Sequence, residues 1–345
     1  MIKGNAGIME HHKADVLIVG AGPVGLFSVF ACGMQKLRCQ VVDSLEMIGG
    51  QCNALYPEKP IYDIPAYPRI TGADLIEKLQ AQIAPFHPVF HLGHQIQQLH
   101  FYEGNWQAKT NKNLVINASA VIVAAGVGAF GPNRPPLANI EEYEGKSVFY
   151  HVRQPSQFAG KTIVIAGGGD SALDWAINLS PLTAKTYLIH RRQKFRAAPA
   201  SLEKLEDLVK KGKIEVVVPY QLHELKGKNG FLTEMVLQDL DGHQKSLKAD
   251  ALLAFFGLSN QLGPIADWGL SLDHHHIKIN PEHCSTNQQG IYAVGDIAAY
   301  PGKLKLILTG FSEAASAAHA IRAYLRPDEV VHFEYSTTSG VNPLS

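Results

Sequence analysis

The sequence contains few cysteines and no excess of charge of either sign. Only four cysteines occur in 345 residues, and none forms a C-x-x-C pair, which is too few for a disulfide scaffold. We expect these four to be buried as small hydrophobic side chains: Cys32, Cys39, Cys52 and Cys284. The 31 Lys and Arg residues equal the 31 Asp and Glu residues in number, so no net field attracts nucleic acid or an acidic membrane surface. The composition excludes a disulfide-rich secreted protein and argues against a polybasic binder of nucleic acid.

Signals for export or membrane insertion are also missing. The first 15 residues contain no apolar stretch long enough for a signal peptide. Residues 16–34 run 19 positions without a charge, which is the length of a membrane span. Three glycines and a proline interrupt the first half of this run, and a buried strand followed by a turn and a buried helix has the same hydropathy. We therefore expect a cytoplasmic protein without a membrane span.

One pattern of strand, glycine-rich turn, helix and strand occurs twice, at residues 15–43 and 161–190. Asp43 lies 23 positions after Gly20, and His190 lies 23 positions after Gly167, so the two copies share a register. Each copy is typical of a βαβ nucleotide-binding unit. A length of 345 residues, at about 150 residues per domain, also predicts two domains. The sequence predicts an α/β protein with two Rossmann-like domains.

Residues outside these units predict further elements by period and composition. Helices are expected at 73–84, 201–211 and 312–325, and buried strands at 119–126 and 249–257. Short strands over 85–118, a Pro/Gly-rich hinge at 128–137 and a hairpin near 226–230 complete the pattern.

The first glycine-rich turn, G-A-G-P-V-G over residues 20–25, follows a buried strand and opens a helix. In this context Gly20 makes the turn, Gly22 lets the backbone approach a pyrophosphate, and Gly25 lets the helix pack closely on the strand. Pro23 belongs to the same turn. The free amides of the helix N-terminus then face the anion. Asp43, at the end of the second strand, is predicted to accept hydrogen bonds from ribose hydroxyls.

The second turn reads G-x-G-x-x-A and is followed by a basic segment instead of an acid. The predicted dinucleotide-binding residues of this unit are Gly167, Gly169, Asp170, Ser171, Ala172, His190, Arg191, Arg192 and Arg196. An acid at the position of His190 would repel a 2′-phosphate, whereas guanidinium groups bind it through charge-assisted hydrogen bonds. The second unit is therefore predicted to bind NADP(H) in preference to NAD(H). Two such sites in one chain imply a flavin that receives hydride from NADPH.

These motifs, together with G-G-Q at 49–51 and A-V-G-D at 293–296, resemble the low-molecular-weight thioredoxin reductase family over about residues 14–325. The resemblance implies the three-layer, FAD- and NAD(P)-binding fold of that family. However, the stretch 147–161 lacks the C-x-x-C of thioredoxin reductases, so thiol–disulfide exchange is not expected. Segments 54–65, 301–311 and 335–340 resemble the ferredoxin–NADP reductases of the thioredoxin-reductase-like type.

The resemblance to these reductases implies site residues and domain boundaries. Tyr56 and Tyr335 match aromatics that stack on the two flavin faces, and Ser336 flanks the second. Further FAD-binding residues implied in this way are Gln51, Ile96, Phe130, Asp296 and Thr337. The FAD-binding domain is expected at 1–131 and 258–345, and the NADP-binding domain at 132–257.

The function implied by the resemblance is electron transfer between NADPH and ferredoxin or flavodoxin through FAD. No side chain is required as an acid or base. Two alternatives stay open: a disulfide reductase that uses other cysteines, and a non-catalytic flavin-binding regulator. The family also implies a homodimer whose tail, residues 327–345, covers the flavin of the partner subunit. No metal site is expected, and the histidine run 274–276 is interpreted as a solvated loop.

Overall fold

The computed structural model describes residues 10–152, 154–329, 337 and 340–341. The chain divides into two compact units, of which unit 1 comprises residues 1–130 and 260–345 and unit 2 comprises residues 131–259. These limits lie close to the expected boundaries after 131 and before 258.

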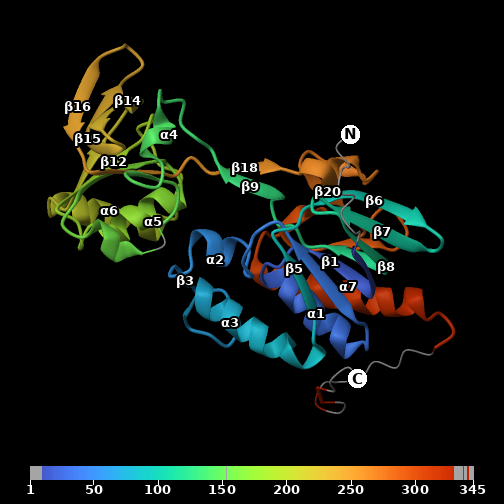
Figure 1. The fold of residues 1–345 in the computed structure, drawn as a ribbon. Coiled ribbons are helices and arrows are strands. Elements are labelled where there is room, and N and C mark those ends of the chain that lie inside the picture. Colours follow the sequence, from blue (N-terminus) through green and yellow to red (C-terminus); the bar gives the residue numbers. More distant parts are fainter. Residues whose placement is uncertain (1–9, 153, 330–336, 338–339, 342–345) are drawn as a thin grey trace, which may run out of the picture. The chain divides into compact units, whose positions relative to one another are not determined.

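Unit 1 is organised around one seven-stranded sheet, visible in Figure 1. Five strands form its parallel part in the order β5-β2-β1-β8-β21. Two antiparallel strands, β7 and β6, continue it from β8. The strands are β1 (Glu10–Val19), β2 (Cys39–Asp43), β5 (Val89–Leu92), β6 (Ile96–Tyr102), β7 (Asn105–Thr110), β8 (Leu114–Val123) and β21 (Ile291–Ala293). The centre of this sheet is apolar on both faces because layers pack against it from both sides.

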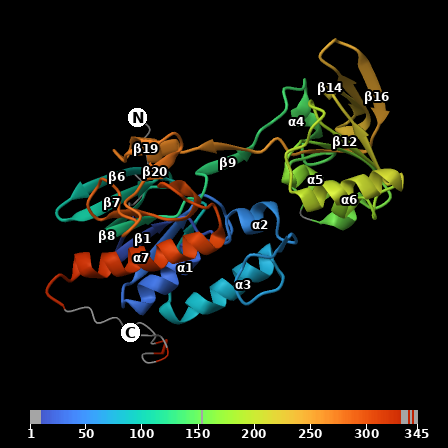
Figure 2. The same ribbon diagram turned by 180° about the vertical axis from the view of Figure 1, so that it is seen from behind.

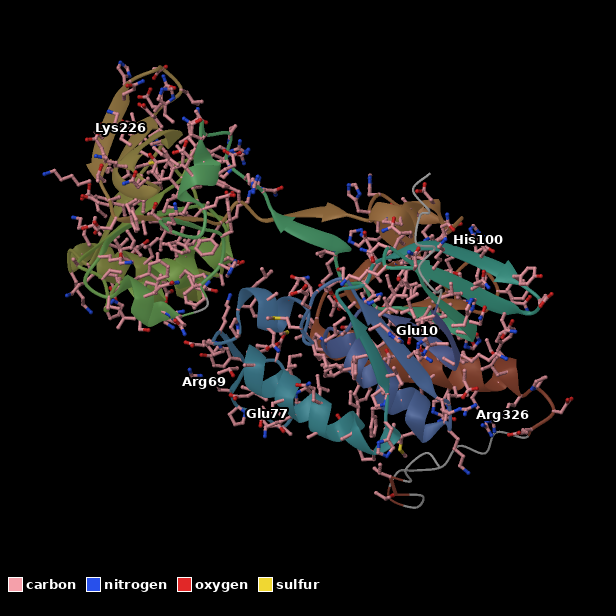
Figure 3. The ribbon with its side chains drawn as sticks, viewed as in Figure 1. Glu10, Arg69, Glu77, His100, Lys226 and Arg326 are labelled. Atoms are coloured by element: carbon pink, nitrogen blue, oxygen red, sulfur yellow. The ribbon has the colours of Figure 1, made fainter. Side chains whose placement is uncertain are left out.

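Three helices cover one face of this sheet in both views: α1 (Pro23–Met34), α3 (Gly72–Ile83) and α7 (Ile307–Leu325) (Figures 1 and 2). Helix α3 shows why such helices form, because Leu75, Ile76 and Leu79 recur on its buried face. Glu77 lies on the exposed face and points outward in Figure 3. The helix begins at Thr71, whose hydroxyl accepts a hydrogen bond from the backbone N–H of Asp74 at 3.1 Å.

The opposite face carries a second apolar cluster, which includes Leu17, Leu99, Trp106 and Ile297. Strands β6 and β7 contribute to it, together with the small sheet of β19 (Leu272–Asp273), β20 (His276–Lys278) and β22 (Ala298–Ala299). Unit 1 is therefore a three-layer domain, as the sequence predicts.

Unit 2 contains a five-stranded parallel sheet in the order β10-β17-β11-β12-β13. Helices α5 and α6 contribute apolar side chains to one of its two core clusters. A three-stranded antiparallel sheet, β14-β15-β16, contributes to the other cluster. The elements are β10 (Val148–Phe149), β11 (Thr162–Ala166), α5 (Asp170–Leu179), β12 (Lys185–Ile189), α6 (Pro199–Lys210), β13 (Ile214–Val217), β14 (Gln221–Lys228), β15 (Phe231–Gln238), β16 (Gln244–Lys248) and β17 (Ala251–Ala254).

The remaining elements are short. Strands β9 (Ala129–Pro132) and β18 (Leu258–Gln261) pair with each other where the chain passes between the units. The others are α2 (Gln51–Leu55), β3 (Pro60–Ile61), β4 (Ile70–Thr71) and α4 (Ile140–Tyr143). All four cysteines are free and buried, which confirms the expectation. The structure, over the residues that it describes, contains no helix long and apolar enough to cross a membrane.

Candidate functional site

A pocket opens in unit 1 where the carboxyl ends of the parallel strands meet. Gly20 follows β1, Asp43 ends β2, Ala124 follows β8 and Asp296 lies three residues beyond β21, and each of these residues lines the pocket. Ligands of open α/β sheets bind at this edge. The predicted FAD-binding residues that line the pocket are Gly20, Gly22, Pro23, Asp43, Gln51, Tyr56, Ile96 and Asp296.

The glycine-rich turn at Gly20–Gly25 forms one wall and leaves no room for larger residues. Gly20 has φ +111°, which favours glycine, and a Cβ there would collide with the carbonyl oxygen of Ala124. A Cβ on Gly25 would collide with the carbonyl oxygen of Gly20. Gly22 instead faces open space, because the nearest atom to a Cβ there, the Gly50 Cα, is 4.0 Å away. The turn is thus tightly packed behind the pocket and open toward it, as a pyrophosphate requires.

Asp43 is almost fully buried and is held by two backbone N–H groups. One carboxylate oxygen accepts from Ala21 at 2.6 Å and the other from Leu45 at 2.8 Å. Burial raises the pKa of Asp43 above its ordinary value of 3.8, and the two hydrogen bonds oppose this shift. A carboxylate has about four acceptor positions, so two stay available for ribose hydroxyls.

The segment that contains Gln51 and Tyr56 is attached to the same turn. The Gly49 N–H donates to the carbonyl of Ala21 at 2.9 Å, and Gln51 begins the short helix α2. Tyr56 follows this helix, and its hydroxyl accepts a hydrogen bond from Cys52 Sγ at 3.7 Å. Burial raises the pKa of the Cys52 thiol to about 11, and it also raises the pKa of Tyr56. Both side chains are therefore neutral at physiological pH, and both line the pocket.

Ile96, whose position in the sequence carries no pattern, is placed by strand order. Strand β5 pairs in parallel with β2, so its carboxyl end lies beside Asp43. The His94 N–H donates to the carbonyl of Asp43 at 2.9 Å. Residues His94, Gln95 and Ile96 consequently line the pocket next to the buried carboxylate.

Sequence reasoning missed several lining residues, among them His94, Trp268 and Lys305. Trp268 is buried, and its Nε1 is the one buried side-chain N or O atom without a hydrogen-bond partner in the part of the chain that the structure describes. A buried donor without a partner is costly, so a ligand with acceptor atoms fits this pocket. The only local signal was the Gly/Pro/Trp composition of residues 263–270, which does not by itself indicate a site.

The predicted dinucleotide residues of unit 2 also come together. The backbone N–H of Arg196 donates to the carbonyl of Gly168 at 2.7 Å, and the Ala198 N–H donates to Asp170 Oδ1 at 2.8 Å. The segment 190–198 is therefore folded onto the glycine-rich turn. Ala172 packs directly against Gly167, which explains why a small residue stands there. Ser171 lies exposed in the first turn of α5, the helix that Gly169 caps.

The side chains of this segment separate into one half-buried ring and three exposed cations. His190 lies over Gly168 and stacks on Phe195, with ring centroids 5.5 Å apart. Burial and then the nearby Arg191, Arg192 and Arg196 lower the pKa of His190, so it is neutral at pH 7. The three arginines are exposed, and within the described residues none is paired with a carboxylate. An anion can therefore reach all three.

A few predicted residues lack a described environment. Tyr335 and Ser336 lie outside the described residues, as does the side chain of Phe130 on β9. Thr337 is exposed. In the histidine run, His274 and His275 form the exposed turn between β19 and β20, whereas His276 begins β20.

Comparison with known proteins identifies the group to which this architecture belongs. Residues 14–322 match the family model of the pyridine nucleotide-disulphide oxidoreductases. A protein of Paramagnetospirillum magneticum described as "Ferredoxin--NADP reductase" is 57% identical over 334 residues, which cover 96% of this chain and 99% of that protein. One from Rhodospirillum rubrum with the same description is 54% identical over 333 residues, or 95% of this chain and 96% of that protein. The chain belongs to the ferredoxin–NADP reductase family.

Solved structures with the same fold include thioredoxin reductases. The structure described as "T. acidophilum thioredoxin reductase" has a TM-score of 0.78 at 23% identity, and the match covers 92% of this chain and 100% of that one. That of Lactococcus lactis has a TM-score of 0.77 at 22% identity and covers 91% of this chain and 99% of its own. These structural similarities establish the thioredoxin-reductase-like fold that the motifs predict for this chain.

Proposed function

We propose that this chain is a cytoplasmic, FAD-dependent ferredoxin–NADP⁺ reductase that exchanges electrons between NADPH and ferredoxin or flavodoxin. The observation that carries the proposal is the high identity, over nearly the whole length, to relatives that bear this description. The pocket of unit 1 supports FAD as the cofactor, and the exposed arginines of unit 2 support NADP(H). FAD, when bound, supplies the conversion between two-electron and one-electron transfer.

The protein's own residues bind and orient in this proposal, and none has to transfer a proton. The turn at Gly20–Gly25 and Asp43 hold the nucleotide part of FAD, while Gln51, Tyr56 and Asp296 hold the remainder. Arg191, Arg192 and Arg196 bind the 2′-phosphate of NADP(H). The four free, buried cysteines argue against the disulfide reductase and are compatible with the reducing cytoplasm.

Anaerobic reduction with NADPH tests the function. The purified protein should lose its flavin absorbance on addition of NADPH and then reduce ferredoxin, or flavodoxin, with no new thiols formed. A flavin that stays oxidised would favour the non-catalytic regulator. A flavin that is reduced but passes electrons only to a disulfide substrate would favour the disulfide reductase.

We also propose a homodimer in which the C-terminal tail covers the flavin of the partner subunit, with Tyr335 on the ring and Ser336 and Thr337 beside it. Deletion of residues 332–345 should leave FAD bound but change its fluorescence and its rate of reduction by NADPH, because a stacked aromatic must move before nicotinamide reaches that face. Light scattering gives the oligomeric state. A truncated protein that matches the full-length protein in fluorescence and rate would contradict the role of the tail.

A further inference from the structure

Helix α7 contains a buried carboxylate, Glu313, to which neither proposed nucleotide site assigns a role. Its side chain is only 6% exposed, and that of Lys303, its ion-pair partner, is 7% exposed. The other ion pairs found among the described residues all have at least one partner that is 15% exposed or more. Burial of an ion pair costs desolvation free energy. The position of this pair in the fold therefore needs a structural or functional reason.

Three hydrogen-bond donors converge on this one carboxylate. Oε2 accepts from the backbone N–H of Gly295 at 2.7 Å, and Oε1 accepts from the Tyr300 hydroxyl at 2.7 Å and from Lys303 Nζ. All three donors belong to the segment 295–303, between β21 and α7. Glu313 therefore holds this segment at its beginning, its middle and its end.

The segment held in this way forms part of the pocket wall. Gly295 and Asp296 line the pocket at the beginning of the segment, and Lys305 and Ile307 line it just beyond the end. Glu313 lies one helical turn after Gly310, where a Cβ would collide with Val24 of α1. Helix α7 thus packs directly against the helix that follows the glycine-rich turn, and it offers a rigid base for the carboxylate.

Two further titratable groups, Tyr300 and Cys284, lie close to the pair of Glu313 and Lys303. Cys284, the neighbouring titratable group, adds no charge, since burial and then the Glu313 carboxylate raise the pKa of its thiol to about 12. Tyr300 stays protonated as a donor, because burial and then its hydrogen bond to Glu313 raise its pKa. The Tyr300 hydroxyl is thus available as the donor that the geometry requires.

We propose that Glu313, together with Lys303 and Tyr300, is a positioning residue that fixes the turn bearing Asp296 against the cofactor. The inference rests on the proposed function, in which Asp296 helps to hold the part of FAD beyond its ADP half, namely the ribityl and flavin end. Loss of Glu313 should therefore weaken contacts at that part and leave the adenosine end, at Gly20 and Asp43, unchanged.

The test compares two ligands on the holoenzyme of Glu313→Gln. Release of FAD on dilution, followed by fluorescence, gives the Kd for FAD, and displacement of FAD by ADP gives the Kd for ADP. Loss of charge-assisted hydrogen bonds at the turn should raise the Kd for FAD about 10- to 100-fold. The Kd for ADP should change less than about twofold, which is smaller than the effect of losing a single hydrogen bond. Asp250→Asn is the matched control, because Asp250 accepts from the Thr162 N–H in unit 2, and it should change neither value.

The measurements on Glu313→Gln, Tyr300→Phe and the wild-type protein distinguish a failure of the positioning role from a failure of the proposed function. An unchanged Kd for FAD, or an equal loss for FAD and ADP, in Glu313→Gln would overturn the positioning role. If Glu313→Gln does not fold, Tyr300→Phe decides, because it removes one donor and keeps the ion pair. Its Kd for FAD should rise about 3- to 10-fold with ADP unaffected, and no change would overturn the proposal. A wild-type protein that holds no FAD would instead refute the proposed function.

Discussion

At the residue scale, the two βαβ units differ in the side chains at and just after the end of their second strand. In unit 1 this position is the buried carboxylate of Asp43, held by two N–H groups. In unit 2 it is His190, which is neutral and packs on the turn, so the charge is left to the exposed arginines beside it. This difference in charge supports the proposal that unit 2 binds a 2′-phosphate, because an acid at this position favours a free 2′-hydroxyl and arginines favour a phosphate.

The double variant Arg191→Ala with Arg192→Ala should raise the KM for NADPH at least about 10- to 150-fold, which corresponds to the loss of one charge-assisted contact of roughly 1.5–3 kcal/mol. NADH use should be nearly unchanged because NADH has no 2′-phosphate. Steady-state kinetics with both coenzymes measure the effect. Lys210→Ala with Lys211→Ala, an exposed basic pair of the same unit, is the control. Equal losses with NADPH and NADH would contradict the assignment.

Acid should release FAD before it unfolds the protein. Burial raises the pKa of Asp43 in the folded state, so its carboxyl takes up a proton at a pH above 3.8 and then accepts ribose hydroxyls poorly. The same protonation has the opposite effect on the stability of the fold. An acid whose folded-state pKa is raised stabilises the fold below its ordinary pKa, and this contribution is lost as the pH rises through the raised value.

FAD release and circular dichroism, followed together from pH 7 to pH 3.5, should show the flavin transition at the higher pH. Asp43→Asn should bind FAD more weakly and with little dependence on pH over this range. An Asp43→Asn variant with the wild-type transition would show that another group controls release.

At the scale of elements, the long periodic segments were predicted well and the short ones were not. Helices α3 and α6 lie where the apolar period indicates, and α7 lies where the small-residue composition indicates a helix. Helix α7 begins at Ile307, earlier than the expected 312, and this first residue lines the pocket. Helix α2 has five residues, too few for a period, and the pairing of β9 with β18 depends on residues far apart in the sequence.

Contacts between residues that are far apart in the sequence also limit prediction of the site. Gly20 and Asp43 were predictable because the turn and the strand end are local features. Trp268 and Glu313 reach the pocket wall only through tertiary packing, and nothing in the neighbouring sequence marks them. Ile96 was predicted only through the family resemblance, and strand order explains its position.

Gly310→Ala should destabilise the protein even though alanine favours helices by about 1 kcal/mol over glycine. A Cβ at this position would collide with Val24 and lie 3.3 Å from the Gly295 Cα, and overpacking costs about 1–3 kcal/mol. Urea unfolding gives the change in free energy of unfolding. Ser312→Ala, at an exposed position of the same helix, should be neutral or slightly stabilising. A stabilised Gly310→Ala protein would show that α7 has room to shift.

At the scale of the whole molecule, no thiol is placed for redox chemistry. All four cysteines are free and buried. Burial holds the pKa of Cys52 at about 11 and that of Cys284 at about 12, and the pKa of Cys39 is raised by its contact with Cys32. At pH 8, only about 0.1% of a thiol with the pKa of Cys52 is thiolate, the reactive form.

Replacement of all four cysteines by Ser or Ala should therefore leave NADPH-dependent diaphorase turnover largely intact, with some loss of thermal stability. In the native protein, a thiol reagent should react slowly at pH 7–8 and faster as the pH approaches 11. The number of titratable thiols in denatured samples should be equal before and after reduction by NADPH. An FAD-loaded, cysteine-free protein without turnover would contradict the mechanism.

The chain order of the two units has a consequence for biosynthesis. Unit 2 is continuous, whereas unit 1 is completed only by β21 and α7 near the C-terminus. Until α7 emerges from the ribosome, the face of α1 that packs against Ala317, Ala318 and Ile321 stays uncovered. The nascent chain therefore carries an unfinished sheet with apolar surface while the inserted unit is already complete, which is the situation in which chaperones prevent aggregation. A complete pocket must await synthesis of the turn bearing Asp296, which follows the whole of unit 2 in the chain.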